Sequence, residues 1–584
     1  MRSENMDWVS STGAFTSWDG TELFYRSWRP PQAKDRALIV IHRGHEHSGR
    51  VASQVRELGL NDFWAFSWDV RGHGYSPGER GHAENYYDLV RDLEAFVRFV
   101  STKHVIPVEN IVIVGNSVGA VTASSWAHDF APRIRAMILV APAFRIKLYI
   151  PWAIPLLRMF HKLKDKAFVR SYVKASMLTH DEEQRRLYRD DELITPRISV
   201  KVLLGMHDTA SRVVDDAAAI AMPTLILSAG SDWVVSNEVQ KEFYRNLGSM
   251  RKEMREYPGF FHALLHELHR EKAMEDVREF VVRSFQEDVD RSYLLSADRG
   301  GAMRVEYDLL RQSTSLAKTA YFRLQKYMVR ILGGLSDGLG IGLESGFDSG
   351  RSLDYVYENS PRGRLAIGRA IDRVYLDAIG WKGIRLRRSH LETQLSRAID
   401  AAGAISSPVR VLDVATGCGR YILSVIKARG AGKVHATLRD WDARNLIHGR
   451  EMAVRLGLEH VRFEQADAFD ADSIRSVVPR PNVVVVSGLY ELFSDNDRVR
   501  VSLEAISDVL EPGGFLIYTG QPWHPQLETI ARVLSNRDGA PWVMRRRSQA
   551  ELDELVRAVG FEKTSMEIDP WGIFTVSTAR RVEN

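Results

Sequence analysis

Residues 110–119 read Asn-Ile-Val-Ile-Val-Gly-Asn-Ser-Val-Gly and lead into an apolar stretch at residues 120–127. The β-branched run predicts a buried strand and the stretch after it predicts a helix. The two glycines allow a tight turn in which the two backbones come close. Gly-x-Ser-x-Gly in this context predicts that Ser117 stands above a sheet as a nucleophile, with the Val118 N–H facing a developing oxyanion. A plain strand-to-helix turn is the alternative.

Apolar runs of the same kind recur along the first half of the chain and alternate with amphipathic stretches such as residues 87–100. Strands that alternate with helices predict an α/β fold with a mainly parallel sheet. The charge-rich, helical sequence at residues 142–222 interrupts the alternation, so we expect it to form an inserted cap. The strand-like runs are residues 37–41, 64–68, 136–140 and 223–227.

A serine nucleophile needs a base, and the base needs an acid that orients it. Asp232 follows one predicted strand, and His262 stands in a loop after the next one. The carboxyl ends of neighbouring parallel strands meet at one edge of a sheet. We therefore expect both side chains beside Ser117, in the chain order Ser, Asp, His.

Five ordered segments resemble the monoacylglycerol lipase-like branch of the α/β-hydrolase family, the serine aminopeptidase group. The resemblance covers residues 15–285 and implies an α/β-hydrolase fold with a helical cap that selects an acyl or lipid-like substrate. The segments are residues 42–50, 69–78, 115–119, the stretch around Asp232, and 258–267.

The resemblance also implies roles for individual residues. Ser117 is the nucleophile, His262 the base and Asp232 its orienting acid. The backbone N–H groups of Gly44 and Val118 form the oxyanion hole.

The oxyanion loop departs from the family pattern. Arg43 and His45 stand where the family usually has glycine. Added charge in this loop argues against the usual neutral acyl-glycerol substrate. A peptidase of the same fold is an open alternative, because a fold does not set a substrate.

A second glycine-rich turn, at residues 413–420, reads Asp-Val-Ala-Thr-Gly-Cys-Gly-Arg after a strand-like run. Two cofactor classes use such a turn. A dinucleotide site needs a third glycine where Ile422 stands, and Asp413 would repel a pyrophosphate. The same carboxylate attracts the cationic amino end of a methionine moiety, so charge favours S-adenosylmethionine over NAD.

Acidic residues follow the next two predicted strands. Asp440 is placed to chelate ribose hydroxyls, with Asp442 as a competing candidate. Asp467 is placed to meet an adenine amino group. Together with the glycine turn, these acids fit one nucleotide.

Residues 391–576 are similar to the class I S-adenosylmethionine-dependent methyltransferase family. The similarity implies a Rossmann-like, seven-stranded sheet with a reversed last hairpin, and S-adenosylmethionine as cofactor. Residues 487–490 would face the transferred methyl group. The cofactor-binding residues that we expect are Asp413, Ala415, Gly417, Gly419, Asp440, Asp467 and Ser487.

No base that would activate a methyl acceptor can be identified from the sequence. Tyr490, Glu491 and His524 are candidates, each with a structural role as the alternative.

The length of 584 residues predicts more than one domain. We expect a hydrolase domain at residues 1–289 and a methyltransferase domain at residues 396–584. Residues 290–395 read as a mainly helical connector that is part of the methyltransferase. The glycine-rich stretch at residues 333–342 leaves a flexible linker as the alternative.

Composition excludes several classes of protein. One cysteine, Cys418, rules out a disulfide framework or a cysteine zinc site within the chain, and no metal site is expected. A formal net charge of +4 does not favour nucleic-acid binding. Met1–Asn5 shows no secretory signal, and no apolar run is long enough to span a membrane. These features predict a cytoplasmic protein.

The cap segment at residues 141–166 mixes aromatic and basic side chains. This mixture predicts peripheral contact with the inner face of a membrane.

The sequence as a whole predicts a bifunctional enzyme. It combines a serine hydrolase for a lipid or acyl-glycerol-like ester with methyl transfer to a small-molecule or lipid-like acceptor that it does not name. The alternative is an active esterase or peptidase with a methyltransferase-like domain that only binds a ligand or partner. The sequence carries no information on oligomeric state.

Overall fold

A computed structural model describes residues 8–164, 166–430 and 432–582. The chain divides into two compact units, one ending at Asp290 and the other beginning at Arg291. The segment Met1–Asn5, where no secretory signal is expected, lies outside the described residues. None of the helices in these ranges combines the length and the apolar character needed to cross a membrane.

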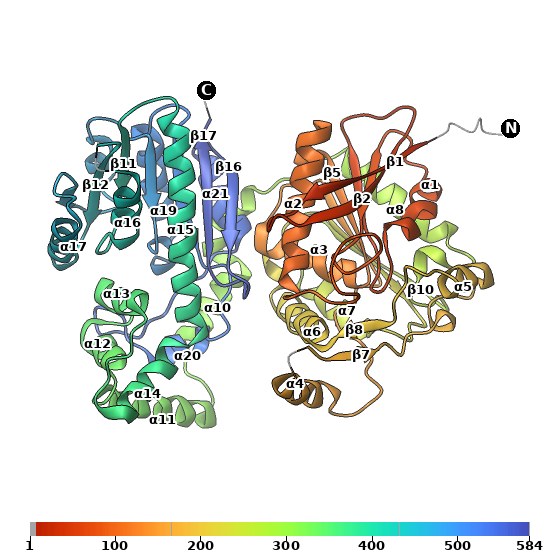
Figure 1. Ribbon diagram of the computed structural model, residues 1–584, viewed down its shortest axis with the longest axis horizontal. Helices are drawn as coiled ribbons and strands as arrows, with labels where there is room; N and C mark the ends of the chain where they lie inside the picture. Colours follow the sequence, from red (N-terminus) through yellow and green to blue (C-terminus); the bar gives the residue numbers. More distant parts are fainter. Residues whose placement is uncertain (1–7, 165, 431, 583–584) are drawn as a thin grey trace. The chain divides into compact units, whose positions relative to one another are not determined.

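The first unit contains an eight-stranded sheet covered by helices (Figure 1). Its strands are β1 (Val9–Thr16), β2 (Glu22–Arg29), β3 (Ala37–Ile41), β4 (Trp64–Trp68), β5 (Ile111–Asn116), β6 (Ala136–Val140), β9 (Thr224–Ala229) and β10 (Lys252–Tyr257). They are ordered β1-β2-β4-β3-β5-β6-β9-β10, and all pairs from β4 to β10 are parallel. The central strands β3, β5, β6 and β9 are buried along their whole length, as a sheet covered on both faces requires.

Helices pack in pairs on this sheet. Helix α2 contacts α3, and α1 contacts α8. The bounds are α1 (Ala52–Leu58), α2 (Tyr87–His104), α3 (Val118–Phe130), α7 (Asn237–Asn246) and α8 (Glu271–Ser284). The predicted α/β-hydrolase architecture is confirmed.

The cap between β6 and β9 is only partly helical. It contains α4 (Ala153–Leu163), β7 (Phe168–Arg170), α5 (Glu182–Arg189), β8 (Arg197–Ser199) and α6 (Val200–Asp215). Strands β7 and β8 form a separate antiparallel pair. Three-residue strands are too short to show a period of two, which is why the sequence predicted helix alone.

The turn between β5 and α3 can be made only with glycine at two positions. A Cβ atom on Gly115 would lie 2.7 Å from Ala120 Cα, and one on Gly119 would lie 2.8 Å from the His42 carbonyl oxygen. Between them Ser117 adopts φ +53° and ψ −108°. The close packing of strand, helix and oxyanion loop therefore holds Ser117 in the strained backbone conformation of a nucleophile elbow.

The second unit contains a seven-stranded sheet in the order β13-β12-β11-β14-β15-β17-β16 (Figure 1). Strand β17 runs antiparallel to both neighbours, and the other pairs are parallel. The reversed last hairpin and the Rossmann-like arrangement are as predicted. The bounds are β11 (Val409–Asp413), β12 (Val434–Asp440), β13 (Arg462–Gln465), β14 (Val483–Val486), β15 (Phe515–Gly520), β16 (Phe561–Ile568) and β17 (Thr575–Arg581).

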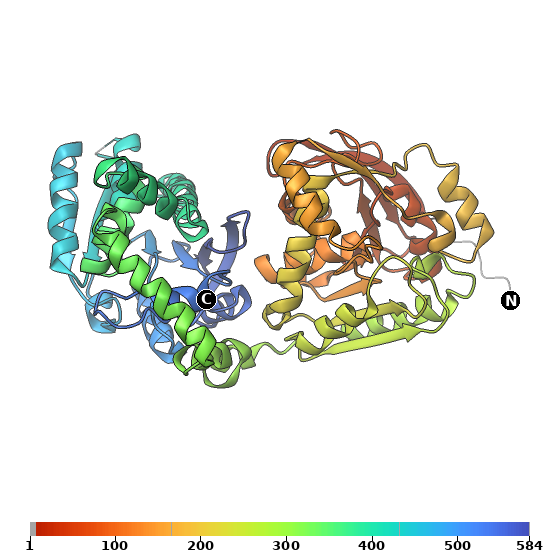
Figure 2. The ribbon, with the colours of Figure 1, turned by 90° about the horizontal axis from the view of Figure 1, so that it is seen from below.

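The helical segment that precedes this sheet packs into the core of the second unit. Helix α15 (Ile379–Gly403) contacts β17 and α16 (Arg420–Arg429), and Figures 1 and 2 show the shorter helices gathered around one end of it. Phe347, Tyr355 and Trp381 share a hydrophobic cluster with Ile573 and Phe574. A flexible linker does not describe this segment.

The glycine-rich stretch at residues 333–342 is mostly helix. It spans the end of α11 (Leu316–Gly333) and most of α12 (Asp337–Ser345). A Cβ atom on Gly338 would lie 2.6 Å from Tyr375 Cε1, on α14 (Leu365–Leu376). Close packing between α12 and α14, and not chain flexibility, explains glycine there.

Replacing Phe347 with alanine is expected to lower the free energy of unfolding of the second unit by about 3–5 kcal/mol, the usual cost of removing a buried aromatic ring. Phe347 has 0% exposure. Calorimetric unfolding of the full chain measures the change. Phe160→Ala on α4, where the ring is 44% exposed, is the matched control and should shift neither transition. If the unfolding transition of the second unit is the same in Phe347→Ala as in the wild type, the helical segment does not contribute to the core of that unit.

Candidate active sites

Ser117, Asp232 and His262 lie together at the carboxyl ends of β5, β9 and β10. His262 Nε2 is 2.8 Å from Ser117 Oγ, and His262 Nδ1 is 2.8 Å from Asp232 Oδ2. All three side chains are buried. In this arrangement a histidine can take the serine proton while the carboxylate orients the imidazole.

Asp232 is held in its ionised form. Burial alone would raise the pKa of this carboxyl, but the charge of His262 and its hydrogen bond lower it below the usual value. The backbone N–H groups of Val234 and Val235 donate to Asp232 Oδ1 at 2.7 and 3.0 Å. The carboxylate is therefore fixed in position while Oδ2 faces the imidazole.

The oxyanion loop follows β3 and lies against the start of α3. A Cβ atom on Gly44 would lie 3.0 Å from Val118 Cγ2, so the two predicted donor residues are neighbours. Val118 is the first residue of α3, so its N–H group has no acceptor within the helix. Asn116 Nδ2 donates to the Ile41 carbonyl at 3.0 Å and ties the elbow to the strand that carries this loop.

His42 holds the oxyanion loop from below. Its Nε2 accepts the Val70 N–H at 3.1 Å, and its Nδ1 lies 2.7 Å from the Arg43 carbonyl oxygen. Burial lowers the pKa of His42, which favours a neutral ring with the proton on Nδ1. The ring can then satisfy both contacts and fix the loop.

The charge of Arg43 does not act as the sequence predicted. Its side chain is buried and donates to Glu46, with Arg43 Nε 3.1 Å from Oε2 and Nη2 2.5 Å from Oε1. Burial opposes ionisation of Glu46, yet Arg43 holds the pKa of Glu46 at about 2. Burial also lowers the pKa of His45, so its neutral form is favoured. Glu46 balances the charge of Arg43 within the loop, and His45 is neutral. The charged residue types of the loop therefore no longer argue against a neutral substrate.

A cavity of about 430 Å³ opens above Ser117. Gly44, Val118 and His262 also line it, so the nucleophile, the base and the oxyanion loop share one space. The cap contributes mainly apolar side chains, as expected of a site for an acyl or lipid-like group. These include Ile150, Leu156, Leu157, Val202, Leu203 and Met206.

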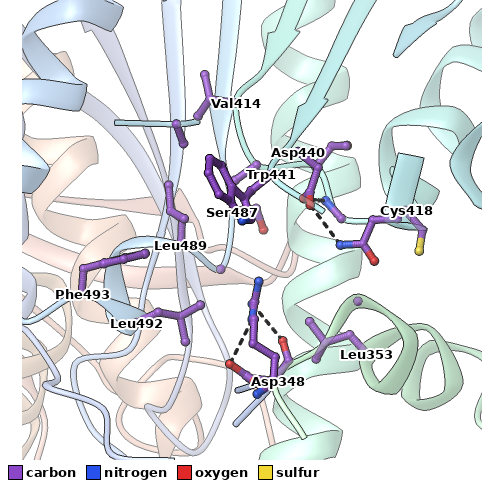
Figure 3. A pocket seen from close by; sticks show the side chains of 18 of the residues that line it. Asp348, Leu353, Val414, Cys418, Asp440, Trp441, Ser487, Leu489, Leu492 and Phe493 are labelled. Atoms are coloured by element: carbon purple, nitrogen blue, oxygen red, sulfur yellow. Dashed lines mark hydrogen bonds and ion pairs between the residues drawn. The ribbon is translucent and has the colours of Figure 1, made fainter. Parts of the chain in front are cut away.

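The second unit has a cavity of about 480 Å³ over the turn between β11 and α16 (Figure 3). Gly417 and Gly419 adopt φ +58° and +71°, and a Cβ atom on Gly417 would meet no atom within 4 Å. The turn thus presents bare backbone to open space, as close approach of a ligand requires. The predicted residues that line this cavity are Ala415, Gly417, Gly419, Asp440, Asp467 and Ser487.

Asp413 lies behind the turn and does not line the cavity. Its exposure is 0%, and its carboxyl accepts hydrogen bonds from the Tyr421 hydroxyl and from the Ala415 N–H, the latter at 3.1 Å. Burial raises the pKa of Asp413 to about 7. In this geometry Asp413 supports the turn. It does not face the cavity, where the sequence predicts it beside the amino end of a methionine moiety.

The structure distinguishes Asp440 from Asp442, the alternative candidate for binding the ribose. Asp440 faces the cavity and accepts hydrogen bonds from the Gly417 N–H at 2.8 Å and from Asn445 Nδ2 at 3.0 Å. Asp442 instead caps α17 (Ala443–Leu456) through the Arg444 N–H at 2.9 Å and does not line this cavity. The geometry favours Asp440.

The predicted methyl-facing stretch is only partly placed at the cavity. Ser487, Gly488 and Leu489 line it. Tyr490 is buried, and its hydroxyl lies 3.1 Å from Ser502 Oγ. Its predicted position beside the methyl group is therefore wrong, because its side chain packs into the hydrophobic core of the sheet, whereas Leu492 and Phe493 again line the cavity.

Sequence reasoning missed several lining residues. Trp441 follows Asp440 and is 70% exposed at the cavity edge, and its position next to a strand-end acid was the available signal. Asp348 and Arg537 come from distant segments and meet at the cavity, with Arg537 N 2.6 Å from Asp348 Oδ1. No local pattern links these two residues.

The donor set fits S-adenosylmethionine. Bare backbone at Gly417, the Asp440 carboxylate and the Asp467 carboxylate are arranged around one space that also carries the indole of Trp441. Such a set offers carboxylates for the ribose hydroxyls and the adenine amino group, and bare backbone where the methionine portion of the cofactor can approach.

Two family models match the chain. The one described as "Serine aminopeptidase, S33" matches residues 32–269, and the one described as "Putative methyltransferase" matches residues 277–581. The second match begins well before residue 391 and includes the helical segment. Both resemblances inferred from the sequence are confirmed.

Relatives differ in how much of the chain they cover. A protein of Escherichia coli (strain K12), named "Uncharacterized protein YnbC", is 44% identical over 98% of this chain and 98% of its own length. Monoglyceride lipase of Rattus norvegicus is 28% identical over 43% of this chain and 82% of its own length. The crystal structure of Paleococcus ferrophilus monoacylglycerol lipase, 22% identical, covers 45% of this chain and 99% of its own at a TM-score of 0.41.

The methyltransferase model covers more than half of the chain, and the Escherichia coli protein matches almost all of it. The chain therefore belongs to the family described as "Putative methyltransferase", and it carries before that part an α/β-hydrolase unit of the serine aminopeptidase S33 type.

Proposed function

We propose that the first unit is a serine hydrolase that cleaves an ester with an acyl or lipid-like portion. The observation that carries the proposal is the hydrogen-bonded array of Ser117, His262 and Asp232 beneath a cavity with apolar cap residues. The similarity to proteins named monoglyceride lipases supports the substrate class.

In the proposed reaction, Ser117 Oγ attacks the ester carbonyl while His262 Nε2 takes the hydroxyl proton. Asp232 stays ionised and stabilises the imidazolium. The N–H groups of Gly44 and Val118 donate to the oxyanion. His262 then gives the proton to the leaving alcohol, and a water molecule activated by His262 releases the acyl group.

A peptidase is the second candidate, because the matching family model is described as a serine aminopeptidase. A peptide substrate needs polar partners for its backbone groups. The apolar cap residues of the cavity and the internal pairing of Arg43 with Glu46 favour the ester.

We propose that the second unit binds S-adenosylmethionine and transfers its methyl group. Asp440 would hold the ribose, Asp467 the adenine, and the backbone from Ala415 to Gly419 would face the cofactor chain. The bound sulfonium would supply the reactive methyl group, while the protein aligns the acceptor and excludes water. A domain that only binds a ligand or partner is the alternative.

We further propose that the cap contacts a membrane surface through α4, placing the enzyme at the inner face. No residue of α4 is buried. Trp152 is 79% exposed and Leu163 80%, and Arg158 and Lys162 lie on the same short segment. Exposed apolar residues interleaved with cations are typical of helices that lie at anionic membrane surfaces.

A fluorophosphonate probe is expected to label the protein, and Ser117→Ala should abolish the labelling because no nucleophile remains. Ser125→Ala is the matched control, since its hydroxyl donates to the Val121 carbonyl within α3 at 2.8 Å and lies outside the array. Gel fluorescence measures both. Labelling that persists in Ser117→Ala would remove Ser117 as the nucleophile.

Asp440→Asn is expected to weaken S-adenosylmethionine binding at least about tenfold, because it removes a charged acceptor from the ribose hydroxyls. Asp442→Asn should leave the affinity unchanged. Isothermal calorimetry compares the two variants with the wild type. Equal affinities for all three, or no heat for the wild type, would count against the cofactor assignment.

Vesicles with anionic headgroups are expected to sediment the wild-type protein at low salt. Leu163→Glu should reduce the bound fraction several-fold, because it places an anion on the membrane-facing helix. Val105→Glu, at another exposed apolar position (81%), is the control. If both variants bind like the wild type, α4 is not the contact.

A further inference from the structure

A second cavity, of about 650 Å³, adjoins the proposed cofactor cavity within the second unit. Its walls come from α11, from the start of α15 and from α20 (Leu527–Val533). Asp348, Leu353, Arg387, Gly488 and Leu492 line both cavities. Figure 3 shows Asp348, Leu353 and Leu492 among the residues that line the cofactor cavity. The second cavity, hereafter the chamber, therefore shares part of its wall with the cofactor cavity.

Most of the chamber wall is apolar. Its rim on α11 and α14 is apolar as well, with Leu324 61% and Val374 74% exposed. A wall and a rim of this kind suit a molecule with a large hydrophobic body. The wall includes Met328, Leu332, Trp381, Ile384, Ile530 and Phe574.

Polar groups without partners line the same chamber. Among the residues that the structure describes, five that line the chamber carry a buried side-chain atom with no hydrogen-bond partner: Arg387 Nε, Glu491 Oε2, Gln521 Nε2, Tyr375 Oη and Trp542 Nε1. Of these residues, Arg387, Glu491 and Gln521 are only 3%, 8% and 5% exposed. An unsatisfied buried polar atom costs stability, so a group of them along one cavity indicates a ligand that supplies the missing bonds.

The charge of these groups limits what the ligand head can be. Arg387 Nη1 is 3.3 Å from Glu491 Oε1, so the cation is already balanced. His524 adds no charge, because burial lowers its pKa to about 4, and its Nδ1 accepts the Gln526 N–H at 3.0 Å. Arg387 and Gln521 contribute donors, and Glu491 contributes an acceptor. A neutral head with a hydroxyl group satisfies both kinds.

We propose that the chamber binds the methyl acceptor and that the acceptor is a long apolar molecule with an uncharged, hydroxyl-bearing head. The proposal rests on the proposed methyl transfer. An oxygen lone pair of the hydroxyl forms the bond to the methyl carbon, the carbon–sulfur electron pair stays on the sulfur of the sulfonium donor, and the hydroxyl proton passes to Glu491 Oε2. Arg387 and Gln521 hold the oxygen at the junction.

A photoreactive diazirine analogue of a long-chain primary alcohol tests the site on the full chain. Labelled peptides are mapped by mass spectrometry, which separates the chamber from the Ser117 cavity. The wild type should be labelled on peptides that contain α11, the start of α15 or α20. Excess oleyl alcohol should compete for this labelling, whereas excess oleyl phosphate, with a charged head, should not.

Two variants probe the chamber from different sides. Thr529→Trp places an indole on its α20 wall and should reduce chamber labelling at least about tenfold, while Thr529→Ser should not. Gln521→Leu removes one unpartnered amide and should reduce labelling about fivefold while keeping or raising the Tm, because an unsatisfied buried group is lost. A purely structural Gln521 would lower the Tm instead. Gln312→Leu, on an exposed loop outside the chamber, is the control.

Calorimetry with S-adenosylmethionine on the same variants separates the two proposals. Retained cofactor binding with lost chamber labelling is the expected result. Retained cofactor binding with wild-type labelling outside the chamber would overturn the acceptor site alone. Absence of cofactor binding in the wild type would overturn the proposed methyl transfer itself.

Discussion

The hydrolase site depends on the tight turn in which β5 passes directly into α3. Ser117 holds a φ of +53° there because its backbone is tied on both sides: its N–H donates to Val140 O at 2.9 Å, and its carbonyl accepts from Ala143 N at 3.1 Å. The neighbouring glycines let β5, α3 and the oxyanion loop approach closely. The loops that carry Gly44 and His262 follow strands of the same parallel sheet, so the sheet places both residues beside Ser117.

The two units use the same edge of a parallel sheet in different ways. In the first, the strand ends carry reactive side chains, and a cap inserted after β6 encloses them. In the second, the strand ends carry a bare glycine turn and carboxylates, and the helices that precede the sheet, together with α20, line the adjoining chamber. In both units the segment outside the sheet contributes the apolar walls, which is why we place substrate selection there.

Each cavity has a buried ion pair in its wall. Arg43, which lines the first cavity, donates two hydrogen bonds to Glu46, and Arg387, which lines the second, donates one to Glu491. Both arginines keep one buried nitrogen without a partner, Nη1 of Arg43 and Nε of Arg387, but both Glu46 oxygens are bonded, whereas Glu491 Oε2 is not. Because an unsatisfied buried acceptor is costly, Glu491 Oε2 is the feature that favours a polar ligand group in the second cavity.

The sequence by itself predicted the central strands of both sheets, their alternation with helices and the residues of both glycine turns, because periodicity and turn chemistry are local. It also named Ser117, Asp232 and His262, since strand ends of a parallel sheet converge. It did not predict the antiparallel strands β1 and β2 of the first sheet. Only the tertiary structure decided where side chains point: Asp413 lies behind its turn, and the charge of Arg43 is balanced by Glu46. It alone assembled the chamber, because these contacts join segments up to about 200 residues apart, such as α11 and α20, and no local pattern encodes them.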